Sequence, residues 1–237
     1  MGQPSLLWPD PAEISTPSDP VPLGILASGS GSNFAAIAQA IRAGELKAEI
    51  AVVITNNPNA YVRRRAEQWG IPCILLNHRE YAQRQALDAA IIEVLKQYRV
   101  EWVIMAGWMR LVTEVLIAAY PGRILNLHPS LLPSFKGLHA VEQALEYGVK
   151  ITGCTVHLVT LEMDSGPIVA QAAVPVLPDD TVESLYQRIQ AQEHRLYPQA
   201  IRLCIGRDPR YPSPQETRTI EETTGTQYGR DPASSDF

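Results

Sequence analysis

Residues 123–140, RILNLHPSLLPSFKGLHA, mark the point where the pattern of this sequence changes. The stretch begins as a buried strand, yet it carries Asn126 and His128 two positions apart, on the same face of an extended chain. Pro129 and Pro133 then prevent a regular continuation, because proline lacks a backbone N–H and fixes its own φ. A core strand therefore ends on two polar side chains and a proline-bounded loop.

Short apolar runs alternate with longer helical patterns on the N-terminal side of this stretch. Several short runs are apolar at nearly every position, which is typical of strands covered on both faces. Two of the periodic segments between them end in a glycine, at Gly44 and Gly70. The expected strands are 21–27, 48–55, 72–76, 102–106 and 123–128, and the expected helices are 32–44, 60–70 and 80–98. This alternation predicts a parallel sheet with right-handed crossovers.

The C-terminal side adds a short helix and two β-rich runs, 150–160 and 166–176, joined by the turn LEMDSG. So short a connection favours antiparallel pairing. A last helix is expected to begin near Asp180 or Thr181, either of which can cap it. The sequence thus predicts an α/β fold: an open, mostly parallel, twisted sheet of about seven strands, with helices on both faces and antiparallel pairing at one edge.

Composition limits the classes of protein to consider. The chain has 237 residues, of which 46% are hydrophobic and 19% charged, and its net charge of −5 argues against a nucleic-acid binder. No run is long enough to span a membrane, and no leader pattern is visible. Three widely separated cysteines without a C-x-x-C spacing favour reduced thiols in a cytoplasmic protein. We expect a flexible extension over 1–20, one domain over 21–205 and a disordered tail over 206–237.

The loop GILASGSGSNF, residues 24–34, joins the first expected strand to the first helix. Gly29, Gly31 and the small residues between them allow a ligand to approach the backbone, and the helix that follows attracts anions such as phosphate. The loop matches neither the dinucleotide fingerprint nor the Walker A motif, because a third glycine and a Gly-Lys pair are missing. A plain tight turn would explain the same residues.

Asn126 and His128 lie where ligands meet an open α/β sheet, at the carboxyl end of a strand. A hydrogen-bonded structural histidine is the alternative interpretation. Asp164, in the turn LEMDSG, has an equally ordinary explanation, because turns favour Asp. A nearby carboxylate is nevertheless what a catalytic imidazole needs to fix its tautomer.

Six motifs occur in one order, and together they closely resemble the phosphoribosylglycinamide formyltransferases, the folate-dependent enzymes of purine synthesis. The resemblance covers roughly residues 21–205, and HPSLLP is shared with a wider group of formyl-handling enzymes. One departure is Trp108, where the family is expected to have Phe or a similar residue, and this change is expected to preserve an aromatic wall. The motifs are SGSGSN, AGWMRLV, LNLHPSLLPSFKGLHA, TGCTVHLV, DSGPIVAQAAVPV and QEHRLYP.

The resemblance implies roles for particular residues. Asn126, His128 and Asp164 fall on the catalytic trio of the family, and Asn126 is also on its folate side. The phosphate loop corresponds to Gly31, Ser32 and Asn33, and the ribose contact to Glu193. The folate pocket corresponds to Arg79, Met109, Arg110, Leu111 and Val112.

The implied reaction moves a formyl group from 10-formyltetrahydrofolate to the amine of 5'-phosphoribosylglycinamide. The implied partners are these two small molecules, with no metal, no nucleic acid and no membrane, and the chain would be a monomer or a homodimer. A tRNA-directed formyltransferase would add a basic C-terminal domain. A formyltetrahydrofolate hydrolase would add an N-terminal regulatory domain and release formate. A nucleotide-binding module without chemistry would not need the trio.

Overall fold

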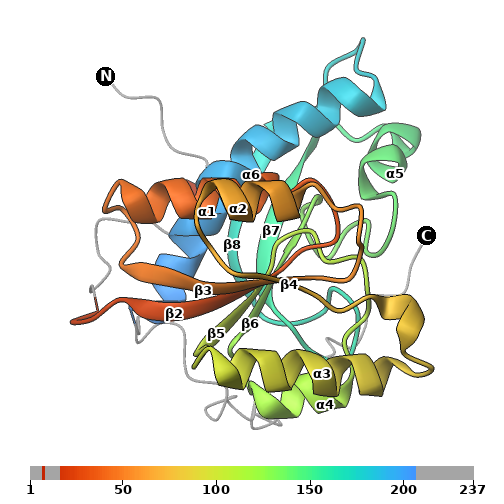
Figure 1. Ribbon diagram of the computed structural model, residues 1–237. Coiled ribbons are helices and arrows are strands. Elements are labelled where there is room, and N and C mark those ends of the chain that lie inside the picture. Colours follow the sequence, from red (N-terminus) through yellow and green to blue (C-terminus); the bar gives the residue numbers. More distant parts are fainter. Residues whose placement is uncertain (1–6, 9–16, 207–237) are drawn as a thin grey trace, which may run out of the picture.

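The computed structural model describes residues 7–8 and 17–206 (Figure 1). Its sheet has eight strands in the order β1-β8-β7-β6-β5-β2-β3-β4. The strands are β1 (Leu7–Trp8), β2 (Val21–Leu26), β3 (Ala48–Thr55), β4 (Cys73–Leu75), β5 (Trp102–Met105), β6 (Ile124–His128), β7 (Ile151–Leu158) and β8 (Ile168–Pro175). Pairing is parallel from β4 to β6 and antiparallel from β6 to β1, so the predicted fold class is confirmed.

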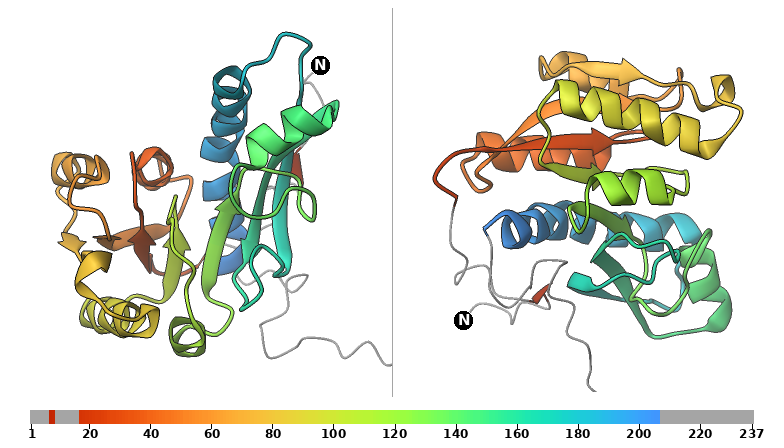
Figure 2. Two further views of the ribbon diagram at one scale, coloured as in Figure 1. Left: turned by 90° about the vertical axis from the view of Figure 1, so that its right-hand side faces the viewer. Right: turned by 90° about the horizontal axis from the view of Figure 1, so that it is seen from below.

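Helices cover both faces of the sheet (Figure 2). One core cluster lies beneath α1, α2 and α6, and a second lies beneath α3 and α4. The helices are α1 (Ser32–Arg42), α2 (Val62–Gln68), α3 (Arg84–Gln97), α4 (Glu114–Ala119), α5 (Ala140–Tyr147) and α6 (Val182–Ile205), with a 3₁₀ turn at His78–Glu80. None of the helices in the described ranges has the length and hydropathy that crossing a membrane requires.

Two elements were not expected from the sequence. Helix α4 is only six residues long, and it is fixed at its start by Thr113, whose N–H and hydroxyl both donate to the buried carboxylate of Asp88. Strand β1 falls within the extension predicted for 1–20 and pairs with β8 through two residues. Beyond Gly206, the predicted C-terminal tail lies outside the described residues.

The strand order predicts a crevice at the carboxyl ends of β2 and β5. The chain proceeds from β2 to β3 and β4 in one direction across the sheet, and from β5 to β6 in the other. Loops that follow neighbouring strands diverge at such a reversal, which is where open α/β sheets bind ligands. Ser28 joins the two loops, because its N–H donates to the Gly107 carbonyl and its Oγ accepts from the N–H of Met109. The glycine loop and the AGWMRLV segment therefore lie side by side.

Helix α6 is anchored to the centre of the sheet by Tyr197. Its side chain is fully buried, and its hydroxyl lies 3.2 Å from the Met105 carbonyl of β5 and 3.1 Å from the Leu125 carbonyl of β6. One hydroxyl hydrogen is therefore shared between the ends of two strands. This contact fixes α6, which carries Glu193, against the strands that lead into the crevice.

We expect Tyr197→Phe to lower the free energy of unfolding by about 1–2 kcal/mol, because the carbonyls of β5 and β6 lose a buried donor. Urea unfolding monitored by circular dichroism would measure the change. The control is Tyr147→Phe, on an 81% exposed side chain, which should leave stability unaltered. Equal stability of both variants would contradict the anchoring role.

Candidate active site

Asn126, His128 and Asp164 converge at the carboxyl end of β6. Asn126 Nδ2 lies 3.5 Å from Asp164 Oδ1, and His128 Nδ1 lies 3.4 Å from Asp164 Oδ2. Both distances are long for hydrogen bonds, so these contacts are weak. The two donors therefore face one carboxylate across contacts that a substrate oxygen can displace.

The two ring nitrogens of His128 differ in how firmly they are held. Nε2 donates to the Phe135 carbonyl at 2.8 Å, within the proline-bounded loop, whereas Nδ1 makes a long contact of 3.4 Å with Asp164. Both nitrogens thus face oxygen acceptors. Nδ1 is therefore the nitrogen at which a substrate oxygen can replace the weak contact with Asp164.

Asp164 is held by the proline-bounded loop that follows β6. Its side chain is 9% exposed, and Oδ2 accepts from the N–H of Gly137 at 2.9 Å. Burial raises the pKa of this carboxyl, but hydrogen bonds from His157 and Gly137 and the nearby charge of His128 outweigh it and lower the pKa. Asp164 is therefore an ionised base at neutral pH.

His157 is a site residue that the sequence reasoning missed. In the antiparallel pair of β6 and β7 it stands opposite Asn126, and its Nε2 lies 3.2 Å from Asn126 Nδ2. Its Nδ1 donates to the Leu158 carbonyl, and its Nε2 also lies 3.5 Å from Asp164. The only signal in the sequence was one imidazole in the otherwise uncharged run TGCTVHLV. His157 fixes the orientation of the Asn126 amide.

The glycine loop begins α1 without a side-chain cap. The N–H groups of the first helical turn have no partner within a helix, so Ser32 and Asn33 present donors at the positive end of the helix dipole. Gly31 has φ +73°, and a Cβ on it would lie 2.5 Å from the Val62 side chain. Only glycine fits this position, and the loop has the geometry of an anion site.

Helix α2 supports that loop from behind. The N–H of Val62 donates to the Gly29 carbonyl, and Arg65 Nε donates to the Ser30 carbonyl at 2.9 Å. Because both carbonyls are directed at α2, they do not face an anion at the loop. Arg65 also brings a positive charge to the neighbourhood of Ser32.

Helix α6 meets the same loop from the other side. The buried Glu193 accepts from Asn33 Nδ2 at 3.0 Å, and Gln190, which the sequence did not single out, donates to Ser32 Oγ at 3.3 Å. Burial raises the pKa of Glu193, while the Asn33 bond opposes that shift. The predicted phosphate loop and ribose residue are thus brought together, and Asn33 Oδ1 is buried with no hydrogen-bond partner among the described residues.

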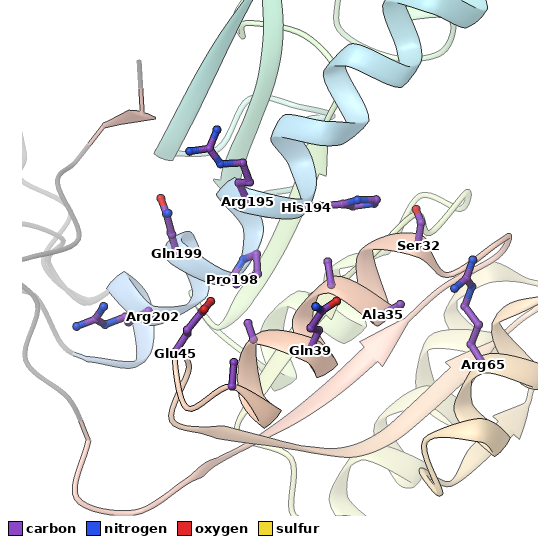
Figure 3. A pocket seen from close by; sticks show the side chains of 13 residues that line it. Ser32, Ala35, Gln39, Glu45, Arg65, His194, Arg195, Pro198, Gln199 and Arg202 are labelled. Carbon is purple, nitrogen blue, oxygen red and sulfur yellow. The ribbon is translucent and has the colours of Figure 1, made fainter. Parts of the chain in front are cut away.

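A groove of about 690 Å³ runs between α1 and α6 from this point (Figure 3). His194 and Arg65 lie at its Ser32 end, and Arg202 and Glu45 lie at the other. Burial, and then the charge of Arg65, lower the pKa of His194. Arg65 thus brings a positive charge to the Ser32 end of the groove.

The predicted folate residues divide into two sets. Arg79, Met109 and Arg110 line a cavity of about 340 Å³, together with the buried Asn56, whose Oδ1 has no partner in the described part of the chain. Leu111 is 52% exposed in the same loop, whereas Val112 packs against the core beneath α3 and α4. Trp108 is buried in that core too, so it is no wall of the cavity. Two arginines beside exposed apolar side chains suit an elongated ligand with an anionic end.

Comparison with known proteins agrees with this geometry. The family model described as formyl transferase matches residues 23–201. Phosphoribosylglycinamide formyltransferase of Bacillus subtilis is 43% identical over 182 residues, which are 77% of this chain and 93% of that protein. The trifunctional purine biosynthetic protein adenosine-3 of Drosophila melanogaster is 43% identical over 185 residues, and the chain spans 14% of its length.

Solved structures show the same similarity. Glycinamide ribonucleotide transformylase 1 from Symbiobacterium toebii is 50% identical, with a TM-score of 0.78 over 79% of this chain and 89% of that one. Phosphoribosylglycinamide formyltransferase from Bacillus halodurans is 46% identical, with a TM-score of 0.76 over 78% and 96%. The predicted resemblance is confirmed, and the chain belongs to the formyl transferase family.

Proposed function

We propose that this chain transfers the formyl group of 10-formyltetrahydrofolate to the amine of 5'-phosphoribosylglycinamide, as a cytoplasmic step of purine biosynthesis. The observation that carries the proposal is the cluster of Asn126, His128 and Asp164 at 3.4–3.5 Å, beside a crevice with an anion site. The names of the Bacillus subtilis relative and of the solved structures support the same acceptor.

The acceptor would be held by its phosphate. The first turn of α1 supplies N–H donors from Ser32 and Asn33, and Arg65 adds a positive charge behind them. Glu193, which accepts from Asn33, would also accept from a ribose hydroxyl. Anchoring at the phosphate leaves the amine free to reach toward β6.

Transfer requires that charge on the formyl oxygen be stabilised. When an amine attacks a formyl carbon, negative charge develops on the oxygen, and preorganised donors in a dry site lower that barrier. Asn126 Nδ2 and His128 Nδ1 would supply these donors by exchanging their long contacts with Asp164 for the oxygen. Phe135 and His157 keep the two side chains in place during this exchange.

Asp164 would carry a proton from the attacking nitrogen to the leaving nitrogen. The attacking nitrogen gains positive charge and must lose a proton, while the leaving nitrogen must gain one. A carboxylate held ionised by Gly137 and His157 can accept the first proton directly or through one water and return it. No covalent intermediate with the protein is needed, because the substrate amine is itself the nucleophile.

The formyl donor would occupy the side of the crevice beneath the loop after β5. Met109 and Leu111 offer exposed apolar surface there, and Arg79 and Arg110 match carboxylates. The unpartnered Asn56 Oδ1 in the same cavity can accept from an N–H of the ligand. The donor set of this cavity thus fits a molecule with an aromatic body and an acidic tail.

Mixing the purified protein with 10-formyltetrahydrofolate and 5'-phosphoribosylglycinamide should change the folate absorbance at a rate that depends on both substrates. Formate should not appear when the amine is omitted, because the proposed acceptor of the formyl group is the amine held by its phosphate. Formate release without the amine would instead identify a hydrolase. Absence of any reaction with both substrates would refute the proposed function.

Asn126→Ala and Asp164→Asn should each lower kcat by about a hundred- to a thousandfold, because each removes a group that acts on charge in the transition state. Thermal unfolding should show that both variants keep the fold. His128→Ala should also lose turnover, with residual activity from the other two side chains. Near-wild-type kcat for Asn126→Ala or Asp164→Asn would contradict its role.

The Glu193→Gln variant should change both the stability of the protein and its KM for the ribonucleotide, and each change can be measured separately. Because the native pKa of Glu193 is raised, ionising it favours unfolding as the pH rises above the ordinary glutamate range. The variant should therefore be more stable than the wild type at pH 8, and this difference should vanish below about pH 3, where the carboxyl is protonated in both the folded and the unfolded state.

The same variant should raise KM for the ribonucleotide by about tenfold, because a charged acceptor for a ribose hydroxyl is lost. Glu146→Gln, on the exposed surface of α5, is the matched control and should alter neither quantity. A lower stability of Glu193→Gln at pH 8, or an unchanged KM, would count against this assignment.

A further inference from the structure

Three consecutive residues connect the proline-bounded loop to the rest of the site. The Phe135 carbonyl accepts from His128 Nε2 at 2.8 Å, and the Gly137 N–H donates to Asp164 Oδ2 at 2.9 Å. Between them, Lys136 Nζ donates to Ser165 Oγ at 2.5 Å. The backbone of this segment therefore holds both the imidazole and the carboxylate, and the side chain between those contacts reaches the residue after Asp164.

Ser165 transmits this contact to the turn that carries Asp164. Its Oγ donates to the Met163 carbonyl at 2.9 Å while it accepts from Lys136. Met163 in turn lies near Gly137, since a Cβ on Gly137 would be 3.2 Å from the Met163 Cε. The 133–139 and 160–166 segments thus meet on both sides of the Gly137–Asp164 hydrogen bond.

The backbone at this junction needs to be held. Phe135 and Asp164 have φ of 54° and 51°, in the left-handed region that residues other than glycine seldom adopt. Such residues cost about 1 kcal/mol or more each and persist only where surrounding contacts fix them. A contact between the two segments is therefore required to keep the Phe135 carbonyl and the Asp164 carboxylate where they are.

Glu162 is a lesser partner. Its oxygen lies 3.7 Å from Lys136 Nζ, and its side chain is 79% exposed, so solvent weakens the ion pair. The bond to Ser165 is shorter and more shielded. The Lys136–Ser165 pair is the contact to test.

We propose that Lys136 is a positioning residue that clamps the 133–139 segment to the 160–166 turn through Ser165, and thereby orients His128 and Asp164 for formyl transfer. This proposal rests on the proposed function. Lys136 touches neither reacting group, so its removal should affect catalysis through the two side chains it positions.

Lys136→Met should lower kcat by about tenfold, with KM for both substrates changed less than about threefold, because a mispositioned base slows chemistry without removing a binding group. Lys136→Arg should restore most of kcat, since it keeps a cationic donor. Lys96→Met, on a 65% exposed side chain of α3, is the matched control and should behave as wild type.

A double-mutant cycle with Ser165→Ala identifies the partner. If the two residues act as one contact, each single variant and the double variant should lose about the same factor of kcat. Full additivity would overturn the proposal. A large rise in KM without rescue by Lys136→Arg would do so too, because it would make Lys136 a substrate ligand.

Amide hydrogen exchange of Gly137, followed by NMR, tests the clamp without any turnover. Exchange should be about tenfold faster in Lys136→Met and in Ser165→Ala than in wild type or Lys96→Met, because its bond to Asp164 opens more often. Unchanged exchange would refute the clamp even in an active enzyme. Faster exchange in a protein that transfers no formyl group would instead count against the proposed function alone.

Discussion

The buried carboxylate of Asp164 is the contact on which the arrangement of this site depends. It accepts a hydrogen bond from the Gly137 N–H and faces Asn126, His128 and His157. One carboxylate, in the 160–166 turn, thus contacts side chains of β6 and β7 and the backbone of the loop after β6. A buried charge is tolerated only when it is surrounded by donors of this kind. The same donors that stabilise the carboxylate are those that formyl transfer would use, and the weakness of the contacts to Asn126 and His128 leaves them available.

Sheet topology decides where the reactants would meet. The reversal of strand order between β2 and β5 separates the loops after these strands, and the antiparallel return from β6 to β7 places His157 opposite Asn126. Because β7 runs antiparallel to β6, its last residue, Leu158, lies opposite Leu125, and the 160–166 turn that follows brings Asp164 back to Asn126 and His128. Under the proposed function, the antiparallel edge would supply the catalytic groups and the parallel half would bind the substrates.

Several features of the site oppose stability. Glu193 is buried with a raised pKa, Asn33 Oδ1 lacks a partner in the described structure, and Phe135 and Asp164 have left-handed backbones. The large clusters beneath α1 and α6 and beneath α3 and α4 stabilise the fold around them. Polar groups left unpaired in a rigid frame are typical of ligand sites, where the ligand completes the hydrogen bonding.

Local patterns in the sequence were sufficient for the parallel half of the sheet, because apolar strands and glycine-terminated helices are short-range signals. They also placed Asn126 and His128 on one face, and the motif resemblance indicated Asp164 and Glu193. They could not reveal α4, which depends on the distant Asp88, or the pairing of β1 with β8. His157, Gln190 and the Lys136–Ser165 contact were equally hidden, because each depends on segments that are far apart in the chain and meet only when the sheet is assembled. The sequence by itself thus determined the local strands and helices and the motifs they carry, whereas long-range packing decided the distances between the proposed catalytic groups.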